Sequence, residues 1–244
     1  AEAVAEHAVG MVLALTKKMV ETDRSLRRER GIDREVFKGW NAEGKTIGVI
    51  GLGNTGRRVA RICGKGLDMQ VIASDPYIEP SDFKERGAEA VSLDELMARS
   101  DFVSVHCPYN AETKDLVSAR ELGLMKPGAF IVNCARGGII NEDALADVLE
   151  ADGIAGAGLD VWDVEPPPMD HRLLAMENVI ATYHTAGVTF ESRENMAAWN
   201  AAQVVSTLRG ERPPRLINPE AWDQFKARYE EVFGQPVEGV GGVF

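Results

Sequence analysis

The stretch TIGVIGLGNTGRRVARI, residues 46–62, decides how this chain folds. Its first five residues predict a buried strand and its end predicts a helix. Between them Gly51, Gly53 and Gly56 form a G-x-G-x-x-G spacing. In that spacing the first glycine permits a tight turn, the second lets the backbone approach a diphosphate, and the third lets helix and strand pack closely. Free N–H groups at the helix N-terminus would face the diphosphate. The stretch therefore predicts a dinucleotide site.

An acidic residue supports this interpretation and favours one cofactor. The next predicted strand, residues 69–74, ends at Asp75, about 20 residues beyond Gly56. A carboxylate there would accept hydrogen bonds from the adenosine ribose and repel a 2′-phosphate, so the sequence favours NAD over NADP. The alternative is a plain turn at residues 51–56 with Asp75 as an exposed loop acid. The agreement of strand, glycines, helix and acid favours the dinucleotide.

The rest of the chain repeats the alternation of strand and helix. Continuous apolar runs, rather than alternating ones, indicate strands that helices cover on both faces, as in a parallel sheet. We expect an α/β fold, a Rossmann-like doubly wound parallel sheet. The expected strands are 46–50, 69–74, 102–106, 129–133, 154–161 and 179–183, and the expected helices between them are 55–66, 93–100, 118–125 and 141–152.

We expect five parts along the chain. Helical periodicity begins at Ala1 without a capping residue, so we also expect that further sequence precedes it. The first helix has an apolar face for which we expect no partner within the chain, which favours an oligomer. The five parts are an inter-domain and dimerisation helix at 1–25, a charged arm at 26–44, the nucleotide-binding domain at 45–190, a helix at 191–210 and an irregular tail at 211–244.

Composition excludes several classes of protein. The chain has 27 Lys and Arg against 38 Asp and Glu, a net charge of −11, which argues against nucleic-acid binding and a polybasic membrane anchor. No apolar stretch reaches the roughly 18 residues of a membrane span. Three cysteines, an odd number, favour free thiols in a reducing cytoplasm. No His, Cys or carboxylate grouping has the spacing of a metal site.

Three polar residues follow predicted strands, where open α/β sheets bind ligands. Arg136 follows the strand at 129–133, Glu165 follows the strand at 154–161, and His184 follows the last strand. Arg136 suits a substrate carboxylate, and His184 could exchange a proton with a carbonyl oxygen while Glu165 raises its pKa. Taken singly, these residues could be a surface charge, a loop acid and a core histidine. Together, downstream of a dinucleotide loop, they favour hydride transfer to a keto acid.

At this point the chain resembles the D-isomer-specific 2-hydroxyacid dehydrogenases from Ala1 to about Trp222. The segments AEAVAEHAVGMVLAL, GLGNTG…SDPY, HCPYNAETKDL, NCARGGIINEDAL, LDVWDVEPPP and TYHTAG occur in that family's order. The resemblance implies a homodimer with Arg136, Glu165 and His184 as catalytic residues. It also implies NAD contacts at Gly51, Gly53, Asn54, Thr55, Gly56, Asp75, Cys107, Pro108, Cys134, Ala135, Arg136, Asp160, His184, Ala186 and Gly187.

Two departures from the family's pattern matter. The family has a flavodoxin-like substrate domain, of which about a hundred residues would precede this sequence. We therefore expect NAD binding but only part of the substrate site. Tyr183 stands where the family usually has proline, and we expect it to pack rather than to contact substrate. Formate dehydrogenases carry glutamine where Glu165 stands, which disfavours that branch.

The expected function is hydride transfer between nicotinamide C4 and C2 of a small D-2-hydroxy acid or 2-keto acid. Candidate substrates are hydroxypyruvate, glyoxylate and 3-phosphoglycerate. One alternative is an NAD-sensing corepressor of the same fold, which the absence of an obvious Lys/Arg-rich nuclear-localisation run disfavours. A second is an isolated cofactor domain without turnover. We expect His7, His106 and His171 to be structural.

Overall fold

The stretch at residues 46–62 folds as predicted, into strand β1 (Thr46–Ile50), a glycine turn and helix α3 (Gly56–Gly66). The computed structural model describes residues 1–213, 215–234 and 236–237. The chain forms two units, Ala1–Gly187 and Val188–Phe244, which we describe separately.

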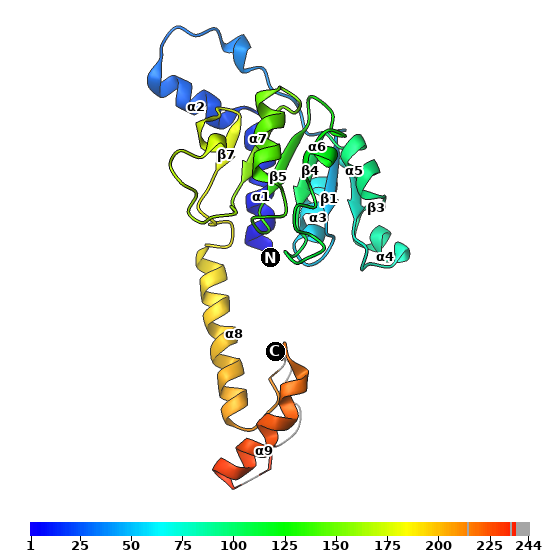
Figure 1. Cartoon of the computed structure of the whole chain (residues 1–244), viewed down its shortest axis with the longest axis vertical. Coiled ribbons are helices and arrows are strands. Elements are labelled where there is room, and N and C mark those ends of the chain that lie inside the picture. The colour runs from blue at the N-terminus through cyan, green and yellow to red at the C-terminus, as the bar shows by residue number, and fades with distance from the viewer. Residues whose placement is uncertain (214, 235, 238–244) are drawn as a thin grey trace. The chain divides into compact units, whose positions relative to one another are not determined.

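The first unit contains a seven-stranded parallel sheet in the order β3-β2-β1-β4-β5-β6-β7 (Figure 1). The order reverses between β1 and β4, which places a ligand crevice at the carboxyl ends of these two strands. The predicted Rossmann-like fold is confirmed. The sequence missed β3 because it has only two residues, both exposed. The other strands are β2 (Gln70–Ser74), β3 (Glu89–Ala90), β4 (Phe102–Val105), β5 (Phe130–Asn133), β6 (Gly156–Leu159) and β7 (Val179–Ala181).

Helices cover both faces of the sheet and bury one hydrophobic cluster on each (Figure 1). On one face, α1 and α3 pack over the strands, with α4 beside the edge strand β3. On the other face lie α5, α6 and α7. The remaining helices of this unit are α1 (Glu2–Thr16), α2 (Met19–Arg28), α4 (Pro80–Glu85), α5 (Leu93–Arg99), α6 (Ala119–Leu122), α7 (Glu142–Glu150) and the 3-10 turns Arg34–Phe37 and Arg172–Ala175.

The opening helix differs from the prediction in two ways. The first helix ends at Thr16, and Lys18 takes a left-handed conformation with φ 51°. The expected single helix at residues 1–25 is therefore two helices. The apolar face of α1 is also buried, against α3, β5 and β6. Gly158 on β6 leaves room for Met11, whose sulfur would lie 3.0 Å from an added Cβ. The expectation of an unpartnered face on this helix is therefore wrong, and so is the argument for oligomerisation that used it.

The second unit holds α8 (Phe190–Leu208), the 3-10 turn Pro219–Ala221 and α9 (Trp222–Phe233). The expected irregular tail is wrong for α9. Aromatic residues at positions 222, 225, 229 and 233 recur at helical spacing and stack in sequence, with ring centroids 4.6–5.7 Å apart. Tyr229 is buried, and its hydroxyl donates to the Leu208 carbonyl at 3.1 Å. These contacts stabilise a helix where the sequence showed no cap.

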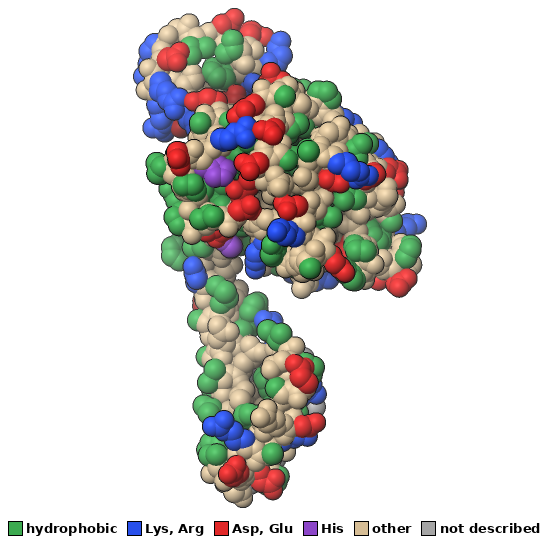
Figure 2. All heavy atoms as spheres, in the orientation of Figure 1, with side chains coloured by type: hydrophobic (Ala, Val, Ile, Leu, Met, Phe, Trp, Pro, Cys, Tyr) green, Lys and Arg blue, Asp and Glu red, His purple; other side chains and the backbone are tan. Residues whose placement is uncertain are grey.

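Across the described ranges, no helix combines the length and apolarity that crossing a bilayer requires. Figure 2 shows acidic side chains interspersed with basic ones on the visible face.

Candidate active site

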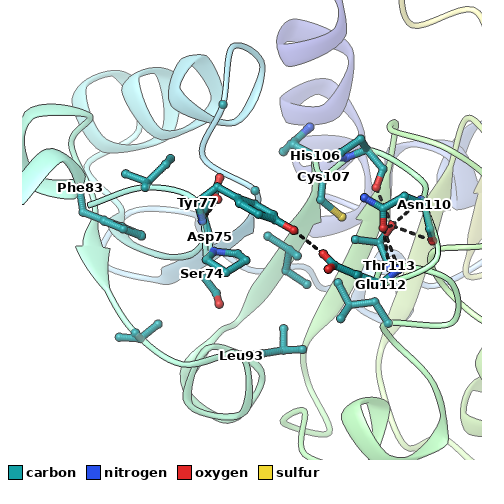
Figure 3. A pocket seen from close by; sticks show the side chains of 18 of the residues that line it. Ser74, Asp75, Tyr77, Phe83, Leu93, His106, Cys107, Asn110, Glu112 and Thr113 are labelled. Carbon is teal, nitrogen blue, oxygen red and sulfur yellow. Dashed lines mark hydrogen bonds between the residues drawn. The ribbon is translucent and has the colours of Figure 1, made fainter. Parts of the chain in front are cut away.

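A cavity of about 680 Å³ opens at the carboxyl ends of β1, β2 and β4, where the strand order reverses (Figure 3). Five of the predicted cofactor residues line it: Gly51, Gly53, Asp75, Cys107 and Pro108. The other predicted residues either adjoin these lining residues in the sequence or follow the strands β5, β6 and β7. Asn54 and Thr55 immediately precede α3, and Gly56 is its first residue. Cys134, Ala135 and Arg136 follow β5, while Asp160, His184, Ala186 and Gly187 follow β6 and β7.

The three glycines of the loop have different surroundings. Gly51 has φ 86°, and a Cβ there would lie 2.7 Å from the Cys107 nitrogen. A Cβ on Gly56 would lie 2.0 Å from the Gly51 carbonyl oxygen, so helix and strand approach too closely for a side chain. A Cβ on Gly53 would meet nothing within 4 Å. The first and third glycines are thus required by the fold, whereas Gly53 leaves open space next to the backbone.

Asp75 ties the end of β2 to the glycine loop. Its Oδ2 accepts a hydrogen bond from the Leu52 amide at 2.9 Å, and its Oδ1 accepts one from the Tyr77 amide at 3.0 Å. Each carboxylate oxygen has a further lone pair, so the group can still accept from ribose hydroxyls. The carboxylate therefore shapes the loop and lines the cavity at once.

A side-chain bridge that the sequence did not predict crosses the cavity. The hydroxyl of the exposed Tyr77 donates a hydrogen bond to Oε2 of Glu112, which lies in the loop after β4 (Figure 3). This hydrogen bond and the charge of Glu112 raise the pKa of Tyr77. Oδ1 of Asn110 accepts a hydrogen bond from the Glu112 amide at 2.8 Å, which fixes that loop. The two bridging residues are far apart in the sequence, and no motif links them.

The histidine and the thiol beside the cavity are uncharged at neutral pH. His106 Nε2 lies 2.7 Å from the Ser104 hydroxyl, while its buried Nδ1 has no partner among the described residues. Burial lowers the pKa of His106 to about 4. Burial raises the pKa of the Cys107 thiol to about 11, and it also raises the pKa of Cys134. Neither cysteine is therefore a thiolate at pH 7.

At the ends of β6 and β7 an acid and a histidine meet. His184 donates from Nδ1 to Oε2 of Glu165 at 2.8 Å. Oε1 of Glu165 accepts from the Trp162 amide at 3.1 Å. Partial burial raises the pKa of Glu165, but the hydrogen bonds from His184 and Trp162 outweigh it and hold the pKa below its usual value. The carboxylate thus fixes the imidazole through Nδ1, and Nε2 has no hydrogen-bond partner among the residues that the structure describes.

The backbone that carries His184 is held by a buried acid. His184 has φ 53°, a left-handed conformation that costs a non-glycine residue free energy unless its surroundings impose it. Its amide donates to the Asp160 carbonyl at 2.7 Å. The fully buried Asp160 carboxylate accepts from the amides of Thr185 at 2.8 Å and Ala186 at 2.9 Å. The structure therefore places this predicted cofactor residue beneath the histidine loop.

Arg136 lies in a turn that packs on the glutamate segment. The buried Asn133 shapes the turn by accepting from the Ala135 amide and donating to the Arg136 carbonyl. A Cβ on Gly137 would lie 2.0 Å from the Trp162 carbonyl oxygen, so the two backbones touch. The guanidinium is exposed and bonds only to the Ala135 carbonyl among the described residues. The turn of Arg136 thus packs on the segment that leads to Glu165, and within the described residues the guanidinium bonds to neither Glu165 nor His184.

A smaller cavity of about 360 Å³ lies beside this pair, lined by Trp162, Glu165, Pro166, Pro167, Tyr183 and His184. Trp162 is buried and donates from its ring nitrogen to the Thr182 carbonyl. Tyr183, however, is 79% exposed, so the expectation that it packs is wrong. Its strand ends at Ala181, and its side chain falls outside the sheet's packing. Within the described ranges, no three His, Cys, Asp or Glu side chains come together as a metal site would require.

Comparison with known proteins gives consistent matches. Residues 9–186 match the family described as D-isomer specific 2-hydroxyacid dehydrogenase, NAD binding domain. The chain is 40% identical to D-3-phosphoglycerate dehydrogenase of Archaeoglobus fulgidus, over 84% of this chain and 39% of that protein. It is 38% identical to glyoxylate reductase of Korarchaeum cryptofilum, over 90% of this chain and 67% of that protein. The chain thus spans about two fifths of the length of such phosphoglycerate dehydrogenases.

Solved structures agree with the fold. A structure of D-lactate dehydrogenase with NAD⁺ from Lactobacillus jensenii superposes with a TM-score of 0.80 at 29% identity, covering 88% of this chain and 68% of that one. The TT0316 protein of Thermus thermophilus gives 0.82 at 32% identity over the same shares.

Proposed function

Because the chain belongs to the D-isomer-specific 2-hydroxyacid dehydrogenase family and carries its NAD-binding domain, we propose that it acts in NAD-dependent oxidation and reduction at C2 of a small D-2-hydroxy acid or 2-keto acid. The observation that carries this proposal is the hydrogen bond between His184 and Glu165 at the ends of β6 and β7. A histidine fixed through one ring nitrogen and free at the other suits proton exchange with a carbonyl oxygen.

The residues present fit the cofactor. Gly51 and Gly56 leave no space for a side chain, and Gly53 leaves an open stretch of backbone at the start of α3. Asp75 lies in the adjoining cavity with acceptor capacity for a ribose. We propose that these residues hold NAD and that Asp75 disfavours NADP by repelling a 2′-phosphate. NAD supplies or accepts the hydride when bound.

The protein's own residues carry the remaining chemistry in this proposal. Arg136 binds the carboxylate of the keto acid in a bidentate grip and polarises its carbonyl. His184 donates a proton from Nε2 to the carbonyl oxygen during reduction and takes it back during oxidation. Glu165 keeps the imidazole oriented through Nδ1, and its negative charge favours the protonated ring.

The substrate class in this proposal comes from the relatives. Their names include D-3-phosphoglycerate dehydrogenase and glyoxylate reductase, so we propose 3-phosphoglycerate, glyoxylate or hydroxypyruvate as the first acids to test.

We also propose that residues 45–190 form the cofactor domain and that the protein is a homodimer. The buried face of α1 cannot form the dimer interface, but other apolar side chains are exposed on α2 and the arm. These are Met19, Leu26, Val36 and Trp40, and they support the dimer. Sedimentation velocity with and without NADH tests it. Sedimentation as a monomer at micromolar concentration in both states would contradict the dimer.

The function is tested by adding NADH and each 2-keto acid to the full-length protein and following the loss of NADH absorbance. We expect turnover of at least one acid and a D-configured product on a chiral column. NADH binding by calorimetry without turnover of any acid, or an L-configured product, would contradict the proposal. NADH-dependent dimerisation without turnover would favour a regulator instead.

A further inference from the structure

A buried acid lies beneath the histidine loop. The Asp160 carboxylate is completely inaccessible to solvent, and a buried charge is costly unless it is hydrogen-bonded or paired. It accepts hydrogen bonds from the Thr182 hydroxyl and from the amides of Thr185 and Ala186. Within the described part of the chain, the one basic side chain within 4 Å is His7 on α1, whose Nε2 lies 3.8 Å from Oδ1.

The hydrogen bonds fix which ring nitrogen of His7 carries a proton. The Thr182 hydroxyl has one proton, and it donates this proton to Asp160 Oδ1 at 2.5 Å. Toward His7 Nε2, 3.3 Å away, the same oxygen therefore acts as acceptor. His7 must then donate from Nε2, whether its ring is neutral or protonated. A donor from α1 thus completes a chain that runs through Thr182 to Asp160.

The series of hydrogen bonds continues from Asp160 to the backbone of His184, the proposed proton donor. Asp160 holds the His184 amide through its carbonyl and holds the next two amides through its carboxylate. α1 also lies close to the same loop at a second point, since a Cβ added to Gly187 would lie 3.8 Å from the Val4 side chain. The first helix therefore backs the loop in which His184 has its left-handed conformation.

We propose that His7 is a positioning residue: its Nε2–H orients Thr182 and Asp160, which hold the loop of His184. The proposal rests on the proposed function, in which His184 exchanges the proton. His7 itself is part of neither the proposed NAD contacts nor the catalytic trio. Its effect should therefore appear mainly in the rate of turnover and in the order of the loop. The affinity for NADH should change less, because the loop carries only some of the proposed NAD contacts.

The test compares His7→Leu with its matched control His7→Gln in the full-length protein. Leucine removes the donor, whereas glutamine keeps a side-chain N–H. We expect kcat to fall about tenfold in His7→Leu, the value of one hydrogen bond, and to stay within about threefold of wild type in His7→Gln. The dissociation constant of NADH should rise by a smaller factor than kcat falls, at most about threefold, because the glycine loop and Asp75 keep their contacts.

A second readout does not depend on activity. In cofactor-free protein we expect the amides of Thr185 and Ala186 to exchange hydrogen about tenfold faster in His7→Leu than in wild type or His7→Gln. Thr182→Val, with Thr182→Ser as its control, tests the same link if His7→Leu does not fold. In the double variant His7→Leu/Thr182→Val, kcat should stay within about twofold of the lower single variant, because both changes break one chain.

Several results would overturn the positioning role. One is unchanged kcat and unchanged amide exchange in His7→Leu. Others are His7→Gln being as impaired as His7→Leu, or losses that multiply in the double variant. These outcomes are distinct from failure of the proposed function, which shows as turnover that survives in His184→Ala. Exchange at Thr185 and Ala186 tests the link in either case.

Discussion

The Nδ1 nitrogen of His184 lies 2.8 Å from the Oε2 oxygen of Glu165, although the two residues are 19 positions apart. The sheet brings them together, because Glu165 follows β6, His184 follows β7, and these two parallel strands are neighbours. The amide of Trp162 fixes the other carboxylate oxygen. Both carboxylate oxygens of Glu165 are therefore held, one by the imidazole and one by a backbone amide.

Replacing Glu165 by glutamine tests the charge of this pair. Glutamine keeps an acceptor for the Trp162 amide but carries no negative charge for the imidazole. We expect kcat to fall about 10- to 100-fold, with NADH affinity unchanged. Steady-state kinetics and calorimetry measure both quantities. Glu165→Ala, which removes the hydrogen bond as well, should lose more; equal activity of wild type and Glu165→Gln would show that the charge is not used.

We propose that Asp75 sets the choice between NAD and NADP. Removing the carboxylate in Asp75→Ala takes away the ribose acceptor and the repulsion of a 2′-phosphate. We expect NADH to bind about tenfold more weakly and the preference over NADPH to shrink by a larger factor. Titration calorimetry with both cofactors measures this. Asp75→Asn is the control, because it can still accept from the Leu52 amide; an unchanged ratio of affinities in both variants would contradict the assignment.

Two alanine substitutions in the glycine loop should have opposite effects. In Gly56→Ala the added methyl would clash with the Gly51 carbonyl oxygen, so we expect a loss of stability of about 2 kcal/mol or more. In Gly53→Ala the methyl meets no protein atom within 4 Å, so stability should stay within about 0.5 kcal/mol. Gly53→Ala should nevertheless weaken NADH binding at least about tenfold, because the methyl occupies the proposed diphosphate space. Urea unfolding with calorimetry checks both, and tight NADH binding by Gly53→Ala would place the diphosphate elsewhere.

His106 should make the fold sensitive to mild acid. Burial lowers its pKa to about 4, whereas an unfolded chain has a histidine pKa of about 6.5. As the pH falls below about 6.5 the unfolded state takes up a proton that the native state refuses, so stability is fully present above that pH and is lost toward pH 4. Between pH 7.5 and 5 we expect wild type to lose about 2 kcal/mol more than His106→Gln. Urea unfolding at the two pH values measures the difference, and parallel losses would argue against a neutral buried ring.

The sequence predicted the features that depend on local pattern. The glycine spacing and the continuous apolar strands predicted the doubly wound parallel sheet, but not the order of its strands. Features that depend on long-range packing were not predicted. The apolar stripe of α1 shows that the helix is buried on one side, but not that β5 and β6 cover it.

The same reason explains what was missed at the site. The link from His7 to Thr182 joins residues 175 positions apart, and neither stands in a recognisable motif for that contact. The Tyr77–Glu112 bridge depends on two loops that the sheet brings together. Tyr183 was expected to pack because aromatic residues usually do, but β7 ends at Ala181 and leaves the ring exposed.

The most direct test of the central claim is the rate of NADH oxidation by His184→Gln in the full-length protein, with its NADH affinity measured in parallel. If His184 exchanges the proton, kcat falls about 10²- to 10⁴-fold while the dissociation constant of NADH stays within about twofold of wild type. A variant that turns over its keto acid at the wild-type rate would contradict the account.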